Sequence, residues 1–224
     1  MQEAPETYYE HPRPEVAELV PETARRVVDV GCASGALGGL LKATRPGIEV
    51  RGIEPVAAQA DTARRVLDDV VTAGAEVPYP AHWPSPDCII FADVLEHMVD
   101  PWSVLERYHG ILQPRGYLVA SLPNVTHWSV IRGLKAHRWD YVDEGILDRT
   151  HLRFFTRDTA IEMFEGAGFA VRIVRRRVDT SRGAGRYFQR QLESEQGRIR
   201  KYHGVLARLA DSATTQFLIG ADRI

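Results

Sequence analysis

The chain has 224 residues, of which 44% are hydrophobic and 26% are charged, and its formal net charge is -2. This composition is that of a globular protein, and the lack of a basic surplus argues against a nucleic-acid partner. Its two cysteines, Cys32 and Cys88, cannot build a disulfide framework, and no signal peptide or membrane-spanning run is recognised. We therefore expect a cytoplasmic protein that binds neither nucleic acid nor membrane.

Strands and helices alternate over the first half of the chain. β-Branched apolar runs predict short buried strands, and apolar residues at helical spacing predict the helices between them. The predicted strands are 26–30, 48–53, 87–91 and 116–122, and the predicted helices are 35–43, 57–71 and 101–111. This alternation predicts a parallel sheet with helices on both faces.

The alternation stops after the strand over 116–122. The segment 124–151 is long, polar and aromatic, and we interpret it as a substrate lid within a single domain over 1–224. The remaining predicted elements are a helix over 157–167, a strand over 169–174, an arginine-rich insertion over 181–210 that is helical over 187–209, and a strand over 215–220. We expect the last two strands to lie together at one sheet edge, one of them antiparallel.

A glycine turn joins the first strand to the first helix, where Asp29–Gly35 reads Asp-Val-Gly-Cys-Ala-Ser-Gly. Glycines at such a turn let a ligand approach the backbone closely. A dinucleotide site has glycine where this chain has Ala33 and Ala36, which disfavours a nicotinamide oxidoreductase. Glu54 ends the next strand, about 20 residues further on, where an acid accepts hydrogen bonds from ribose hydroxyls. A ligand with a ribose but no pyrophosphate suits this pair of features.

Two later segments complete a set of four ordered motifs, namely Phe91–His97 followed by Asp100-Pro101, and Leu112–Leu118. Together the four resemble class I S-adenosylmethionine-dependent methyltransferases over nearly the whole chain. The resemblance implies a Rossmann-like, mostly parallel seven-stranded sheet and S-adenosylmethionine as cofactor. It assigns cofactor binding to Tyr9, Arg13, Asp29, Gly31, Cys32, Ala33, Gly35, Glu54, Pro55, Glu76, Asp93, Val94 and Leu95. The family's adenine-binding acid is replaced here by Ala75, so Glu76 or a backbone carbonyl takes that role.

The second half resembles a narrower subgroup of methyltransferases from glycan and natural-product pathways, on the segments Asn124–Trp128 and Gly145–Thr156. Ligands of open α/β sheets bind beyond the carboxyl ends of the strands, where these segments emerge. The predicted acceptor-binding residues are Asn124, Trp128, Asp148 and Arg153. No metal is predicted, because the spacing of the acids and His137 in 137–144 matches no ligand motif.

Three histidines are candidate catalytic residues, because histidine has a pKa suited to deprotonating a hydroxyl. His97 ranks first since it directly follows the strand over 87–91, and its alternative role is to orient a loop backbone. His151 lies near Asp148 in sequence, in an Asp–His arrangement or in a salt-bridge network that closes the lid. His127 lines the acceptor pocket or packs within its own loop.

We therefore expect an enzyme that O-methylates a small hydroxylated acceptor, such as a sugar or natural product, as a monomer or homodimer. One alternative is N-methylation of a small amine, which needs no strong base. Another is a non-catalytic protein of the same fold that binds a partner enzyme.

Overall fold

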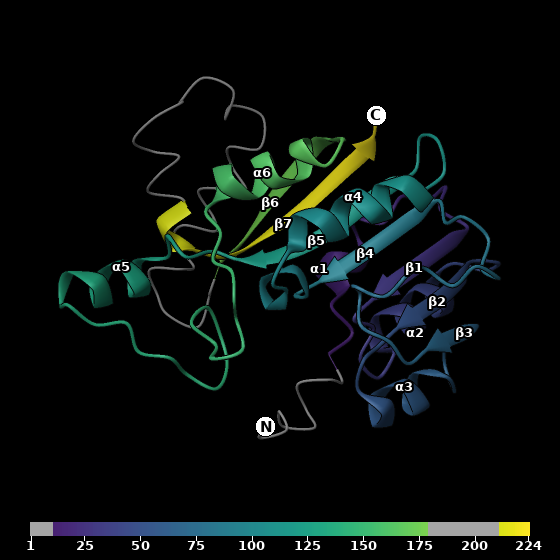
Figure 1. The fold of residues 1–224 in the computed structure, drawn as a ribbon, viewed down its shortest axis with the longest axis horizontal. Coiled ribbons are helices and arrows are strands. Elements are labelled where there is room, and N and C mark those ends of the chain that lie inside the picture. The colour runs from purple at the N-terminus through teal and green to yellow at the C-terminus, as the bar shows by residue number, and fades with distance from the viewer. Residues whose placement is uncertain (1–10, 179–210) are drawn as a thin grey trace.

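The computed structural model describes residues 11–178 and 211–224, so Tyr9 and the insertion predicted over 181–210 lie outside the described residues. Seven described strands form one sheet in the order β3-β2-β1-β4-β5-β7-β6 (Figure 1). They are β1 (Arg26–Val30), β2 (Glu49–Ile53), β3 (Asp69–Val71), β4 (Cys88–Ala92), β5 (Tyr117–Pro123), β6 (Phe169–Val178) and β7 (Thr214–Arg223). Only β7 runs antiparallel to its neighbours, β5 and β6. The Rossmann-like fold and the pair of strands at one edge are thereby confirmed.

Helices cover both faces of the sheet. They are α1 (Pro14–Ala17), α2 (Ala36–Thr44), α3 (Ala57–Ala63), α4 (Pro101–Ile111), α5 (Trp128–Lys135) and α6 (Arg157–Gly166). Neighbouring strand residues point to opposite faces, so Val28 packs in the core with α4 and α6, and Val27 in the core with α1, α2 and α3. Figure 1 shows α4 and α6 side by side on the near face.

The helix predicted over 57–71 is wrong in its second half. α3 ends at Ala63, and the chain then forms β3, which pairs in parallel with β2. The Asp68 carboxylate accepts the N–H of Val50 at 2.7 Å, which fixes the turn. The β-branched Val70 and Val71 then pair with Gly52 and Ile53. The apolar spacing of Leu67 and Val70 fits a helix equally well, so periodicity alone did not reveal the edge strand.

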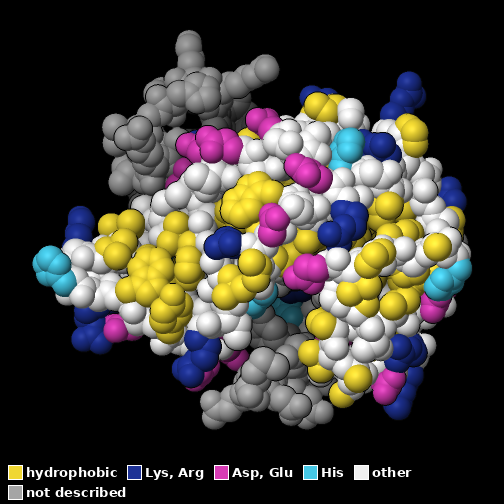
Figure 2. Space-filling view, viewed as in Figure 1, with side chains coloured by type: hydrophobic (Ala, Val, Ile, Leu, Met, Phe, Trp, Pro, Cys, Tyr) yellow, Lys and Arg dark blue, Asp and Glu magenta, His cyan; other side chains and the backbone are white. Residues whose placement is uncertain are grey.

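The segment predicted as a lid carries α5, which lies apart from the sheet (Figure 1). The exposed large hydrophobic side chains of this segment are Trp128, Ile131, Leu134, Tyr141 and Val142. Figure 2 shows hydrophobic side chains gathered on the left of the molecule, where α5 lies. Asn124 and Phe155 form an isolated β-bridge that holds the two ends of the segment together. No helix among the described residues is long and apolar enough to cross a membrane.

Candidate functional site

The glycine turn after β1 has a left-handed backbone at Gly31, Ala33 and Gly35, with φ values of 74°, 48° and 84°. The N–H groups of Gly31 and Cys32 donate to the carbonyl of Ile53 at 2.7 and 3.2 Å, which fastens the turn to β2. A Cβ on Gly31 would lie 2.5 Å from Cγ2 of Val94. The loop after β4 therefore packs directly on the glycine turn, so these two predicted cofactor motifs adjoin.

Glu54 lies at the carboxyl end of β2, is 4% exposed and braces the glycine turn. Its Oε2 accepts the N–H of Ala33 and its Oε1 accepts the N–H of Val56, each at 2.9 Å. Burial raises the pKa of Glu54, and the two backbone hydrogen bonds oppose that rise. Each oxygen keeps acceptor capacity, since a carboxylate has about four lone-pair sites. This geometry fits the ribose hydroxyls of a nucleoside.

Asp29, the fourth residue of β1, adds a second buried acid and is 2% exposed. Burial and the neighbouring Glu54 carboxylate raise the pKa of Asp29 to about 7, against the opposing charge of Arg13. A cationic ligand would stabilise the charged forms of these two neighbouring buried carboxylates. S-adenosylmethionine carries an ammonium, a sulfonium and a ribose, so the acids present at these strand ends fit it.

Arg13 and Asp93 form an ion pair at the ends of β4 and β5. The same guanidinium donates to the Ser121 hydroxyl at 3.2 Å, and that hydroxyl donates to Asp93 at 2.8 Å. Gln216 of β7 also donates to Asp93. Asp93 has a left-handed backbone, with φ at 57°, which turns the chain sharply after β4. Both residues are predicted cofactor contacts, and the structure uses their charges to lock the start of the loop after β4.

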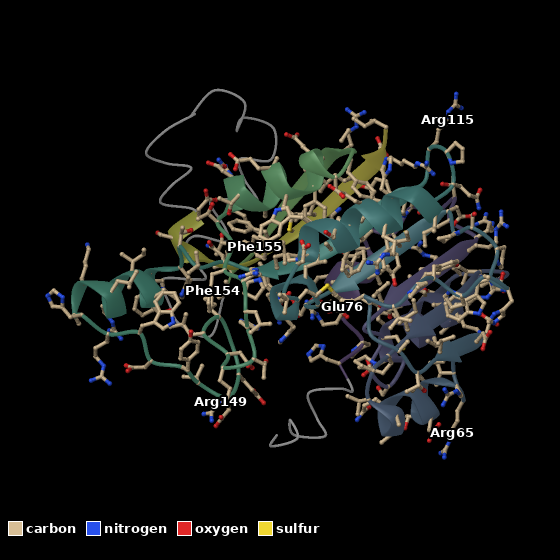
Figure 3. The ribbon with its side chains drawn as sticks, viewed as in Figure 1. Arg65, Glu76, Arg115, Arg149, Phe154 and Phe155 are labelled. Atoms are coloured by element: carbon tan, nitrogen blue, oxygen red, sulfur yellow. The ribbon has the colours of Figure 1, made fainter. Side chains whose placement is uncertain are left out.

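The other predicted cofactor residues differ in exposure. Cys32 and Leu95 are buried, Val94 is half-buried against the turn, and Pro55 is exposed. Glu76 is also exposed, on the loop after β3, and its carbonyl accepts from Arg107 of α4 (Figure 3).

His97 and His151 meet although they are far apart in sequence, with ring centroids 4.7 Å apart. His97 ends η2 (Leu95–His97), a 3₁₀ turn directly after β4. The N–H groups of Leu152 and Arg153 donate to the carbonyl of Glu96 at 2.8 and 3.0 Å. The Arg153 guanidinium also donates to the carbonyl of Val99, so this residue, predicted to bind the acceptor, fastens the returning segment to the η2 region. Figure 3 shows Phe154 and Phe155 on that segment, between α5 and α6, and Arg149 at its outer bend.

Hydrogen bonds at Nδ1 orient both imidazoles. Nδ1 of His151 lies 3.0 Å from the carbonyl of Ile146, and Nδ1 of His97 lies 3.3 Å from the carbonyl of Thr150. Because a carbonyl only accepts, each Nδ1 carries the proton and each Nε2 presents a lone pair. Burial and the nearby His151 lower the pKa of His97, which favours this neutral form.

A chain of hydrogen bonds joins Asp148 to His97 through Thr150. The Thr150 hydroxyl donates to the Asp148 carboxylate at 2.6 Å and lies 3.0 Å from Nδ1 of His97. The sequence leaves two roles open for His151, an Asp–His arrangement with Asp148 or a salt-bridge network that closes the lid. The structure links Asp148 to His97, through a threonine that the spacing did not single out.

Glu96 completes this cluster, and sequence reasoning missed it. Its side chain is 1% exposed, and neither carboxylate oxygen has a hydrogen-bond partner in the described part of the chain. Burial and the nearby charge of Asp93 raise the pKa of Glu96 well above its ordinary value. Its position between Leu95 and His97 was visible, but only the fold shows that it is buried beside His151.

Asn124 and His127 have structural partners after β5. Asn124 is fully buried and donates to the carbonyls of Asp211 and Thr214 at 2.7 and 2.8 Å. His127 caps the start of α5, where its side chain accepts the N–H of Ser129. Trp128 is 38% exposed, with Arg132 stacked 5.1 Å from the ring. Asn124 therefore anchors the start of β7. Among the four predicted acceptor contacts, Trp128 is the most exposed.

Residues 4–173 match the family described as a methyltransferase domain, so the chain belongs to that family. A trans-aconitate 2-methyltransferase from Methylobacterium radiotolerans is 32% identical over 114 residues, which is 50% of this chain and 44% of the relative. A ubiquinone biosynthesis O-methyltransferase from Nitrobacter winogradskyi is 28% identical over 155 residues, which is 65% of this chain and 57% of the relative. The chain spans about half the length of these curated relatives.

The fold agrees with that family. The structure of a possible histamine N-methyltransferase from Thermotoga maritima superposes with a TM-score of 0.64 at 20% identity, covering 97% of this chain and 89% of that one. The family and the fold are those of class I S-adenosylmethionine-dependent methyltransferases, and they imply S-adenosylmethionine as the cofactor.

Proposed function

We propose that this protein transfers a methyl group from S-adenosylmethionine to a hydroxyl oxygen of a small acceptor such as a sugar or natural product. The observation that carries the proposal is the pairing of His97, which follows β4, with His151 of the returning segment, because each imidazole presents an Nε2 lone pair. A hydroxyl needs a group of this kind to receive its proton, whereas a neutral amine does not.

Different residues of the chain bind the cofactor and receive the proton. Glu54 and Asp29 would hold the ribose and the positive charge of the cofactor, which would supply an already activated methyl group. The acceptor oxygen would form its bond to the methyl carbon as the carbon–sulfur bond breaks, with the bonding electron pair staying on sulfur. The hydroxyl proton passes to Nε2 of His97, whose ring Thr150 and Asp148 hold in place. Because the methyl group is activated, positioning supplies much of the rate enhancement.

The relatives support oxygen as the acceptor atom without naming the acceptor. One curated relative is called an O-methyltransferase and another a trans-aconitate methyltransferase. Exposed apolar side chains on the 124–151 segment, with Trp128 among them, suit a lid that closes over an apolar or ring-shaped molecule.

A panel of sugars, phenols and amines tests the proposal by the formation of S-adenosylhomocysteine. We expect turnover with hydroxylated acceptors that rises with pH as His97 becomes neutral. Turnover with amines alone would favour the N-methyltransferase. Tight cofactor binding with no turnover on any acceptor would favour a non-catalytic partner protein.

A further inference from the structure

We propose that Glu96, His97 and His151 form a binding site for one divalent transition-metal cation, with Zn²⁺ and Mn²⁺ as the closest chemical matches. One ligand atom from each of the three side chains lies within 4.8 Å of the others. The residue spacing in the sequence did not predict this site, because the first two ligands come from the η2 turn and the third from the distant segment that packs on it.

The two histidines are oriented as metal-binding histidines are. A metal-bound imidazole usually donates its other ring N–H to a carbonyl or carboxylate, which fixes the tautomer and the ring. Nδ1 of His151 meets the Ile146 carbonyl, and Nδ1 of His97 meets Thr150. Thr150 in turn donates a hydrogen bond to Asp148, which fixes the position of Thr150 against the His97 ring. Both Nε2 atoms are left for a cation.

Glu96 supplies the independent observation that points to a ligand. A carboxylate with no hydrogen-bond donor is expensive to bury, and both oxygens of Glu96 lack one in the described chain although the side chain is 1% exposed. The positive charge of Arg13 is already paired with Asp93 and Glu15. A bound cation would satisfy Glu96 and offset the charges of Asp93 and Asp148 together.

The donor set indicates which cation. Two imidazoles and one carboxylate suit zinc and other transition metals, whereas calcium and magnesium prefer oxygen ligands alone. Bonds of about 2.0–2.2 Å require the three side chains to draw together by about 1 Å. Three protein ligands leave at least one position open, as in catalytic zinc sites.

The open position gives the site its function, and this part of the inference rests on the proposed methyl transfer. An acceptor hydroxyl bound there has a lowered pKa, so the cation does the work that a neighbouring base would otherwise do. With the cation bound, His97 acts as a ligand and the acceptor's proton passes to solvent water. Without the cation, the proton passes to Nε2 of His97 as proposed above.

Calorimetry with Zn²⁺ and the absorption of added Co²⁺ test the site on the full chain after treatment with a chelator. We expect one cation per chain and a higher midpoint of thermal unfolding when Zn²⁺ is present. Glu96→Gln and His151→Ala should each weaken Zn²⁺ binding by more than about 100-fold, and Thr150→Val, which removes an outer contact, by about 10-fold. His82→Ala removes an exposed histidine beside Asp69 and should leave binding unchanged.

Binding that survives both ligand variants, or that His82→Ala reduces as much, would overturn the site. Should Glu96→Gln not fold, His151→Ala and His97→Ala decide the question. Failure of methyl transfer is a separate outcome, because S-adenosylhomocysteine affinity and turnover are measured on their own. Full turnover on a hydroxyl in excess chelator would refute the cation's part and leave the methyltransferase proposal standing.

Discussion

The carboxylate of Glu54 accepts the backbone N–H of Ala33 at 2.9 Å, so the acid at the end of β2 also holds the glycine turn after β1. A residue predicted only as a ribose contact thus also shapes the loop that is predicted to bind the cofactor. The same carboxylate accepts the N–H of Val56, which fixes the start of α3.

Replacement of Glu54 by alanine should affect both binding and stability. We expect S-adenosylhomocysteine affinity to fall by about 1–3 kcal/mol, because the ribose loses a charged acceptor. The free energy of unfolding should fall by a similar amount, about 1–3 kcal/mol, because two backbone N–H groups lose their partner. Calorimetry and urea unfolding measure the two effects. Glu49→Ala, at the other end of β2, is the control and should change neither; unchanged affinity in Glu54→Ala would remove Glu54 from the site.

Asp29 should make the cofactor-free protein less stable as pH rises. Its folded pKa of about 7 lies above the ordinary aspartate value of 3.8, so between these two pH values the folded state holds a proton that the unfolded state has lost. Stability therefore falls by up to about 1.4 kcal/mol per pH unit across this window and levels off above it. Asp29→Asn should remove that slope in urea unfolding measured from pH 4 to 9. The same pH slope in the unfolding free energies of the unchanged protein and of Asp29→Asn would contradict the assignment of this slope to Asp29.

Asn124 separates an anchoring role from an acceptor-binding role. Asn124→Ala should lower the free energy of unfolding by about 1–3 kcal/mol, because the carbonyls of Asp211 and Thr214 lose their buried donor. Gln113→Ala removes a surface amide that donates to Ser85 and should cost less than about 0.5 kcal/mol. If Asn124→Ala kept its full stability and lost only acceptor binding, Asn124 would be an acceptor contact and not an anchor.

The sequence predicted the fold well because the turn, the strand ends and the alternating elements are local features. It placed Glu54 and Asp93 at strand ends, and it selected His97 and His151. It did not predict that Asp93 forms an ion pair with Arg13, or that Glu96 is buried beside His151. Both facts depend on contacts between distant segments, whose hydrogen bonds leave no local pattern. The same holds for β3, whose apolar residues fit a helix until β2 pairs with them.

The segment 124–151 should lose mobility when the site is filled. Its exposed side chains include Trp128 and Leu134, and we expect them to become buried when the segment closes over bound ligands. Hydrogen exchange over residues 128–142 should slow when S-adenosylhomocysteine and an acceptor are both present. α6 serves as the internal reference, since its buried face already packs in the core. Equal protection of 128–142 in the free and fully liganded proteins would show that this segment is no lid.

The rate of methyl transfer in His97 variants tests most directly whether the cluster after β4 prepares a hydroxyl acceptor. His97→Ala should lower turnover by about 10²–10⁴-fold, the usual contribution of a positioned base, with S-adenosylhomocysteine affinity unchanged. His97→Asn, which keeps a hydrogen-bonding group without a basic one, should be nearly as slow, and His82→Ala should retain the full rate. Full turnover of both His97 variants on a hydroxylated acceptor would contradict the proposed role of His97 and favour transfer to an amine.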